Sequence, residues 1–309
     1  MLTILALAAA MLYGTADFLG GVASRRASVF AVLALTVPAG AVVMVLVALF
    51  GQVPALGGLL GHGGLGTPAS VGNWSAVGWA AASGVCGAAG LVAFYAGFAS
   101  APISVVAPVA ALVSAILPVG VAISGGERPT ATVIAGGLVC LVAIVMVSSQ
   151  PAEHAEHAEH AEHAGPGHAR PNLRLRALGY GAAAGVGFGL FFIFLKNAGQ
   201  SGVLWPVAIS RSAGTVVALG IVLATRTRVP FGRGGITGVA LLSGGIDAAA
   251  NVCYVLATRA GQFGLAVVIT SLYPGITVLL ARVLLGERMR WLQRAGLLIA
   301  AVGVVLVTV

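Results

Sequence analysis

Apolar residues fall in long runs along the chain, separated by short polar or glycine-rich segments. A helix needs about 20 mostly apolar residues to cross the hydrocarbon core of a bilayer. Within the runs the apolar positions are continuous rather than alternating, which favours helices over barrel strands. The pattern predicts an all-α polytopic membrane protein with ten transmembrane helices, at residues 2–22, 29–49, 74–96, 102–124, 130–149, 177–197, 203–224, 236–258, 263–285 and 291–308.

Composition excludes the soluble classes. Only 8% of the 309 residues are charged and 59% are hydrophobic, against a charged share of roughly 25% in soluble domains. The net charge of +8 comes from arginines in small groups between the apolar runs, so no continuous basic face for nucleic acid is expected. The first run carries Asp17 and has no preceding Lys or Arg, which favours a transmembrane helix over a secretory signal.

The chain contains an internal repeat. A shift of 160 positions aligns residues 80–148 with 240–308 without a gap, and it matches Ser83-Gly84 with Ser243-Gly244. Each half then holds five spans, and because five is odd the second half enters the membrane from the opposite side. Inverted repeats are typical of secondary transporters, whose substrate site lies where the halves meet. We expect a first repeat at 1–149, a low-complexity loop at 150–172 and a second repeat at 173–309.

Three tracts resemble the EamA-type members of the drug/metabolite transporter superfamily: residues 7–26, 100–128 and 269–288. The resemblance covers the chain except for 150–172. It implies a bundle of five plus five helices with a central cavity and alternating access. It also implies small metabolites as substrates, often amino acids or toxic compounds that are exported. The sequence has no HExxH motif and no clustered intramembrane carboxylates, so we expect no enzymatic activity, and we expect no cofactor.

The positive charges leave the membrane orientation open. The odd-numbered loops carry eleven arginines, whereas the even-numbered loops carry only Arg128, Lys196 and Arg259. By the positive-inside rule both termini would lie outside, whereas the resemblance implies termini inside. We expect a multi-pass protein of the plasma membrane, acting as a monomer or homodimer, with the lipid bilayer and a small-molecule substrate as its partners.

Ionisable side chains inside the spans are candidates for the substrate site, because each costs a few kcal/mol to insert. Asp17 lies four residues after Tyr13, on the same helical face, and Asp247, Asn251 and Tyr254 form a polar stripe on the eighth run. In the functional interpretation these residues line a cavity and a carboxylate binds a substrate amine or carries protons. In the alternative, Asp247 forms a structural ion pair with Arg211 and Asp17 reaches water.

Prolines indicate a second set of candidate substrate-binding residues. Pro102, Pro108 and Pro118 fall in the fourth run, and Pro274 falls in its repeat counterpart, the ninth. Proline frees a backbone carbonyl, and interrupted helices at corresponding places in two halves point to a transport site. Tyr273 and Pro274, with Thr270 on the same face, are therefore added to the predicted substrate-binding residues.

The repeated Gly-Glu-Arg motif stands at two loop entrances and predicts local ion pairs that fix the loops. The pairs are Glu127 with Arg128 and Glu287 with Arg288.

A histidine-rich tract at 152–168 supplies the alternative function. It consists of four Ala-Glu-His units and one further histidine, which gives five weak candidate metal ligands: His154, His157, His160, His163 and His168. Imidazoles bind Zn, Ni or Cu, so a divalent metal-cation transporter competes with the metabolite exporter. An expanded repeat in a solvated linker is the simpler interpretation, because long insertions cost little loop entropy.

Deletion of residues 153–168 separates these two functions. A metabolite carrier is expected to keep its solute flux without the tract, because in that interpretation the tract is only a linker between the halves. Flux in proteoliposomes and growth in the presence of zinc are compared for the full and shortened chains. Loss of metal tolerance on deletion would favour the metal carrier.

Overall fold

The computed structural model describes residues 1–24, 27–50, 72–100, 103–148, 171–227, 234–285 and 291–308. These residues form helices and turns and contain no strand, which confirms the all-α prediction for the described part of the chain. The helices are α1 (Leu2–Ser24), α2 (Val29–Phe50), α5 (Trp74–Ser100), α6 (Ile103–Ser124), α7 (Ala131–Ser148), α9 (Pro171–Ala198), α10 (Leu204–Thr225), α11 (Gly234–Arg259), α12 (Phe263–Thr270), α13 (Tyr273–Leu285) and α14 (Trp291–Thr308).

The described helices have the dimensions of membrane spans. Eight segments are long and apolar enough to cross a membrane, with α12 and α13 counted together, and the apolar stretches of α7 and α14 are shorter. Each of the ten predicted runs coincides with one of these segments. Helices of this length and hydropathy satisfy their backbone polar groups internally, as the hydrocarbon core requires.

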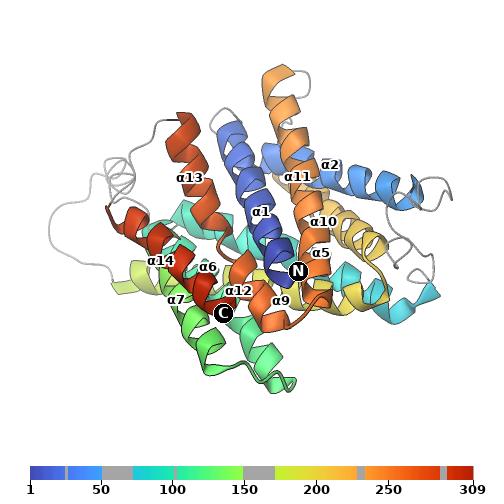
Figure 1. Ribbon diagram of the computed structural model, residues 1–309. Coiled ribbons are helices and arrows are strands. Elements are labelled where there is room, and N and C mark those ends of the chain that lie inside the picture. Colours follow the sequence, from blue (N-terminus) through green and yellow to red (C-terminus); the bar gives the residue numbers. More distant parts are fainter. Residues whose placement is uncertain are drawn as a thin grey trace, which may run out of the picture.

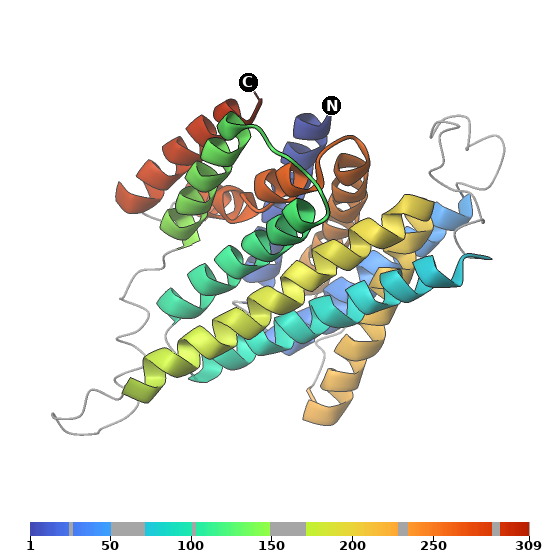
Figure 2. The same ribbon diagram turned by 90° about the horizontal axis from the view of Figure 1, so that it is seen from below.

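The bundle contains two groups of three helices, and each group mixes the two halves of the sequence. In one group α9 packs between α5 and α6; in the other α1 packs between α11 and the α12–α13 pair. Figure 1 shows α1 standing between α13 and α11, and Figure 2 shows α9 running between α5 and α6. Each half therefore contributes a helix to the middle of a group formed by the other half.

The remaining helices pair across the halves as well. Helix α2 packs on α10 and on α11, α10 packs on α5, and α7 packs on α14. Helix α1 begins and α14 ends toward the same side of the bundle in both views. This placement suits a chain with an even number of crossings.

Helix bounds in the second half repeat those in the first. Helix α7 moved by 160 residues falls on α14, and α5 moved by the same amount falls on α11 apart from one terminal residue. The partners correspond too, because α5 packs on α9 and α10 whereas α11 packs on α1 and α2. The described fold is therefore compatible with the repeat that the sequence predicts.

The aligned serines make equivalent hydrogen bonds. Ser83 Oγ on α5 donates to the carbonyl oxygen of Phe191 on α9, at 3.0 Å, and Ser243 Oγ on α11 donates to that of Ala16 on α1, at 2.8 Å. Each hydroxyl thus ties the central helix of a group to a neighbour from the other half.

The glycines that follow these serines permit the closest helix approaches. A Cβ at Gly84 would overlap the carbonyl oxygen of Ser210 on α10, and a Cβ at Gly244 would overlap that of Thr36 on α2. Small residues are what allow membrane helices to pack backbone to backbone. Two matching helix crossings therefore explain why the Ser-Gly pair stands at equivalent positions in the two halves of this chain.

Among the described residues the prolines do not interrupt the two halves at matching places, which corrects the sequence-based expectation; Pro102 lies outside these residues. Helix α6 continues through Pro108 and Pro118, whereas its counterpart is broken between α12 and α13. Pro274 has no N–H to offer the carbonyl of Thr270, and Gly275 N–H bonds to Leu272 O at 2.9 Å in a tighter turn. Shifted by 160, Pro274 corresponds to Ser114, so the signal for the break is present in one half alone.

Glu127 connects the halves by capping a helix. Its carboxylate oxygens accept hydrogen bonds from the backbone N–H groups of Phe263, at 2.7 Å, and Gly264, at 3.1 Å, at the start of α12. A carboxylate there satisfies free N–H groups and complements the helix dipole. The described residues show no ion pair between Glu127 and Arg128. Glu287 and Arg288 lie outside the described residues.

Alanine at Gly84 or Gly244 is expected to destabilise the protein by about 1–3 kcal/mol, the usual cost of overpacking. Thermal unfolding in detergent micelles measures this as a lower midpoint. Gly245→Ala is the matched control, because a Cβ there meets nothing within 4 Å. Equal midpoints for all three variants would contradict the crossings described here.

Loss of the Glu127 cap is expected to cost about 1 kcal/mol, as for other side-chain caps. Glu127→Ala removes both acceptors, whereas Glu127→Gln keeps one and should lose less, as measured by the thermal midpoint. Arg128→Gln on the exposed neighbouring residue serves as the control. A loss from Arg128→Gln as large as that from Glu127→Ala would favour the local ion pair over the cap.

Candidate functional site

A hydrogen bond between α1 and α11 lies at the centre of the bundle. Tyr13 Oη donates to Asn251 Oδ1 at 2.8 Å, and both side chains are buried. Asn251 Nδ2 donates to the carbonyl oxygen of Asp247 on its own helix, at 2.6 Å. This second bond orients the amide so that its oxygen faces Tyr13. The predicted polar stripe on α11 therefore faces the predicted polar residue on α1.

An ion pair joins α10 to the same stripe. The Arg211 guanidinium contacts the Asp247 carboxylate, and their side chains are 13% and 29% exposed. A lone charge at this depth would cost several kcal/mol, which an opposite charge offsets in part. This ion pair is what the sequence analysis gave as the alternative to a role of Asp247 in substrate binding. It also fixes the guanidinium within electrostatic range of Tyr13.

Aromatic rings surround Tyr13. Its ring centroid lies 6.2 Å from that of Phe192 on α9 and 6.1 Å from that of Tyr273 at the start of α13. Tyr254 Oη donates to the carbonyl oxygen of Phe192 at 2.8 Å. Tyr254 is fully buried, so its role here is to hold α11 against α9. Phe192 joins the cluster although no pattern in the sequence distinguishes it from a packing residue.

Asp17 differs from Asp247 in having no hydrogen-bond or ion-pair partner among the described residues. It lies one helical turn after Tyr13, its residue is exposed, and it is within electrostatic range of Tyr273. An intramembrane carboxylate is normally paired or directed toward water. Asp17 is therefore available to a ligand in a way that Asp247 is not.

Several buried polar atoms have no hydrogen-bond partner within the described structure. Thr270 Oγ1 and Ser271 Oγ lie at the helix break, and Trp205 Nε1 and Arg211 Nε lie on α10. Buried polar groups normally find a partner in protein or water, so each is free to bond to solute or water. Sequence analysis identified Thr270 but missed Ser271 and Trp205. The weak signals for them were a second hydroxyl before Tyr273-Pro274 and a tryptophan next to a proline.

Pro274 and the predicted metal ligands are not part of this cluster. Pro274 lines an apolar groove between α1, α7, α13 and α14, and this groove contains none of the polar cluster. The five candidate metal-ligating histidines lie outside the described residues. In the part of the chain that is described, no three His, Cys, Asp or Glu side chains are grouped to hold a metal ion.

The cluster supplies both signs of charge and little reactive chemistry. Arg211 offers donors in the fork geometry that suits a carboxylate, and Asp17 offers an acceptor for an amine. Tyr13 and Tyr273 supply flat apolar surface beside them. Such a set can bind a small solute that carries both charges.

Comparison with known proteins identifies a transporter family and a shared fold. Residues 175–309 match the model of the EamA-like transporter family. No curated protein matches the chain. A solved structure described only as a crystal structure of a protein is similar to it, with a TM-score of 0.72 and 18% identity over 99% of this chain and 96% of the other. That similarity shows a shared fold. Residues 175–309 are therefore similar to the EamA-like transporter family, and they form part of a multi-pass membrane protein.

Proposed function

We propose that the chain is a secondary transporter of small zwitterionic metabolites such as amino acids, working as an exporter by alternating access. The observation that carries the proposal is the ion pair of Arg211 with Asp247 inside membrane spans, next to the bond from Tyr13 on α1 to Asn251 on the same α11 stripe. A protein that only needed packing there would be more stable with apolar side chains. Export and the plasma-membrane location are taken from the family resemblance.

In this proposal Arg211 binds the carboxylate of the solute. Its Nε has no hydrogen-bond partner among the described atoms, and the bond to Asp247 holds the guanidinium in place. A solute carboxylate at Nε shares the positive charge of the guanidinium with Asp247, so binding weakens the ion pair between α10 and α11. Asp17 binds the amine, and the rings of Tyr13 and Tyr273 limit the size of the side chain that fits.

Alternating access then follows from the interleaved halves. We infer that residues 1–149 and 173–309 form two inverted repeats, supported by the equivalent Ser83 and Ser243 bonds and the matching helix bounds. The bond from Tyr13 to Asn251 crosses between the two repeats and would break when they rock apart, whereas the ion pair from Arg211 to Asp247 lies within the second repeat. In secondary transporters such rocking moves the access from one side to the other around a fixed site.

Proteoliposome flux with a panel of solutes tests the proposal. Zwitterionic amino acids, amines and carboxylic acids are offered with and without a proton gradient. Asp17→Asn and Arg211→Gln each remove a charge-assisted bond of about 1.5–3 kcal/mol, so zwitterion uptake at low concentration should fall by roughly ten- to a hundredfold.

Thr15→Val is the control for this measurement. Thr15 Oγ1 bonds to the carbonyl oxygen of Met11 on its own helix, at 2.7 Å, so the variant should transport normally. If no small solute moves under any gradient, the proposed function is wrong. If amines alone move and Arg211→Gln has no effect, the zwitterionic substrate class is wrong.

A further inference from the structure

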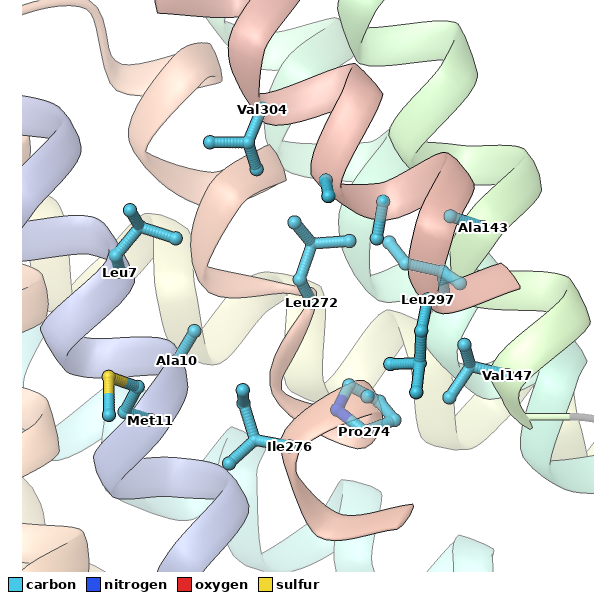
Figure 3. A pocket seen from close by; sticks show the side chains of 14 residues that line it. Leu7, Ala10, Met11, Ala143, Val147, Leu272, Pro274, Ile276, Leu297 and Val304 are labelled. Carbon is cyan, nitrogen blue, oxygen red and sulfur yellow. The ribbon is translucent and has the colours of Figure 1, made fainter. Parts of the chain in front are cut away.

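An apolar groove of about 310 Å³ lies between α1, α7, α13 and α14. Figure 3 shows side chains from these helices pointing into it, with Leu7 and Met11 on one side, Ala143 and Leu297 on the other, and Pro274 at one end. No lining side chain carries a polar group. Water in such a space would find no hydrogen-bond partners, and an apolar cavity of half this volume already takes an apolar ligand.

The groove is continuous with the apolar outer surface of the bundle. Met11, which lines it, is 58% exposed, and Leu298 and Val302 on α14 are 71% and 55% exposed. Met11 is nine residues from the start of α1, which at 1.5 Å per residue is roughly 14 Å along the helix. This depth is about half of the ~30 Å hydrocarbon core, so the groove opens where only lipid tails are present.

We propose that this groove binds one acyl chain of a membrane phospholipid. A tail matches the apolar lining, the depth and the lateral opening, whereas a headgroup remains at the interface. The small residues Ala10, Ala300 and Ala301 provide the width. The site does not depend on the proposed transport function, because any membrane protein with this groove would face the same hydrocarbon.

The bound chain supports the helix break next to the polar cluster. It contacts Pro274 and Ile276, which line the groove in the first turn of α13. Ile276 in turn packs on Gly14, where a Cβ would overlap both Ile276 and the carbonyl oxygen of Tyr273. Gly14 follows Tyr13 directly. A tail in the groove therefore fills the space behind the contact between α13 and α1 and keeps Tyr273 against Tyr13.

Photolabelling tests the site. The full chain is reconstituted in dioleoylphosphatidylcholine vesicles that contain increasing amounts of a phosphatidylcholine with a mid-chain diazirine. Labelled peptides are mapped by mass spectrometry after irradiation. Labelling at Met11 is expected to saturate at a low fraction of the probe, whereas labelling at Leu298 on the outer face of α14 rises in proportion to it.

Matched variants identify the occupant. Ala301→Phe fills the groove and should reduce labelling at Met11 several-fold, and the smaller change Ala300→Val should reduce it less; Leu298→Phe on the same helix should leave it unchanged. Thermal midpoints show that each variant is folded.

The proposal would be overturned if labelling at Met11 rose in proportion to the fraction of probe lipid and Ala301→Phe did not alter it. That result would mean that Met11 contacts ordinary bulk lipid. Crosslinks between two copies at Met11, or loss of labelling on addition of transported solute, would assign the groove to another occupant and overturn it as well.

Discussion

Close crossings between helices of opposite halves are the constraint on which the rest of the structure depends. In a bilayer there is little hydrophobic force between helices, so association relies on backbone approach and interhelical hydrogen bonds. The Ser-Gly pairs at 83–84 and 243–244 provide both, a hydroxyl bonded to a neighbouring carbonyl and a glycine at the contact. Because each pair joins helices of different halves, neither half can form one of the two three-helix groups alone. The Glu127 cap on α12 connects them a third time.

This interleaving explains how charged groups come to meet inside the membrane. Helix α11 is held against α1 and α2, and it presents Asp247 to Arg211 on α10 and Asn251 to Tyr13 on α1. The ion pair reduces the cost of two intramembrane charges but does not abolish it. Asp17, without a partner among the described residues, adds to that cost. Such an arrangement is retained where the charges serve a ligand, and this links the packing to the proposed transport site.

The sequence predicted those features that local physics determines. The ten apolar runs coincide with the helical segments because bilayer thickness sets their length, and the four-residue spacing of Asp247 and Asn251 placed both on one face of α11. The Glu127 cap and the burial of Tyr254 against the Phe192 carbonyl could not be predicted, because they depend on which distant helices become neighbours. The break at Ser271–Leu272 was expected to have a counterpart in α6. Helix α6 continues through Pro108 and Pro118, whereas Pro274 follows the interruption between α12 and α13.

Counterflow tests the central claim that one site between the halves opens alternately to the two sides of the membrane. Proteoliposomes are preloaded with an unlabelled zwitterionic amino acid, and the entry of the same compound in labelled form is followed with no other gradient. A carrier whose loaded form reorients faster than its empty form takes up label faster and transiently concentrates it inside. Entry that preloading does not accelerate, with label never exceeding its external concentration, would contradict the account.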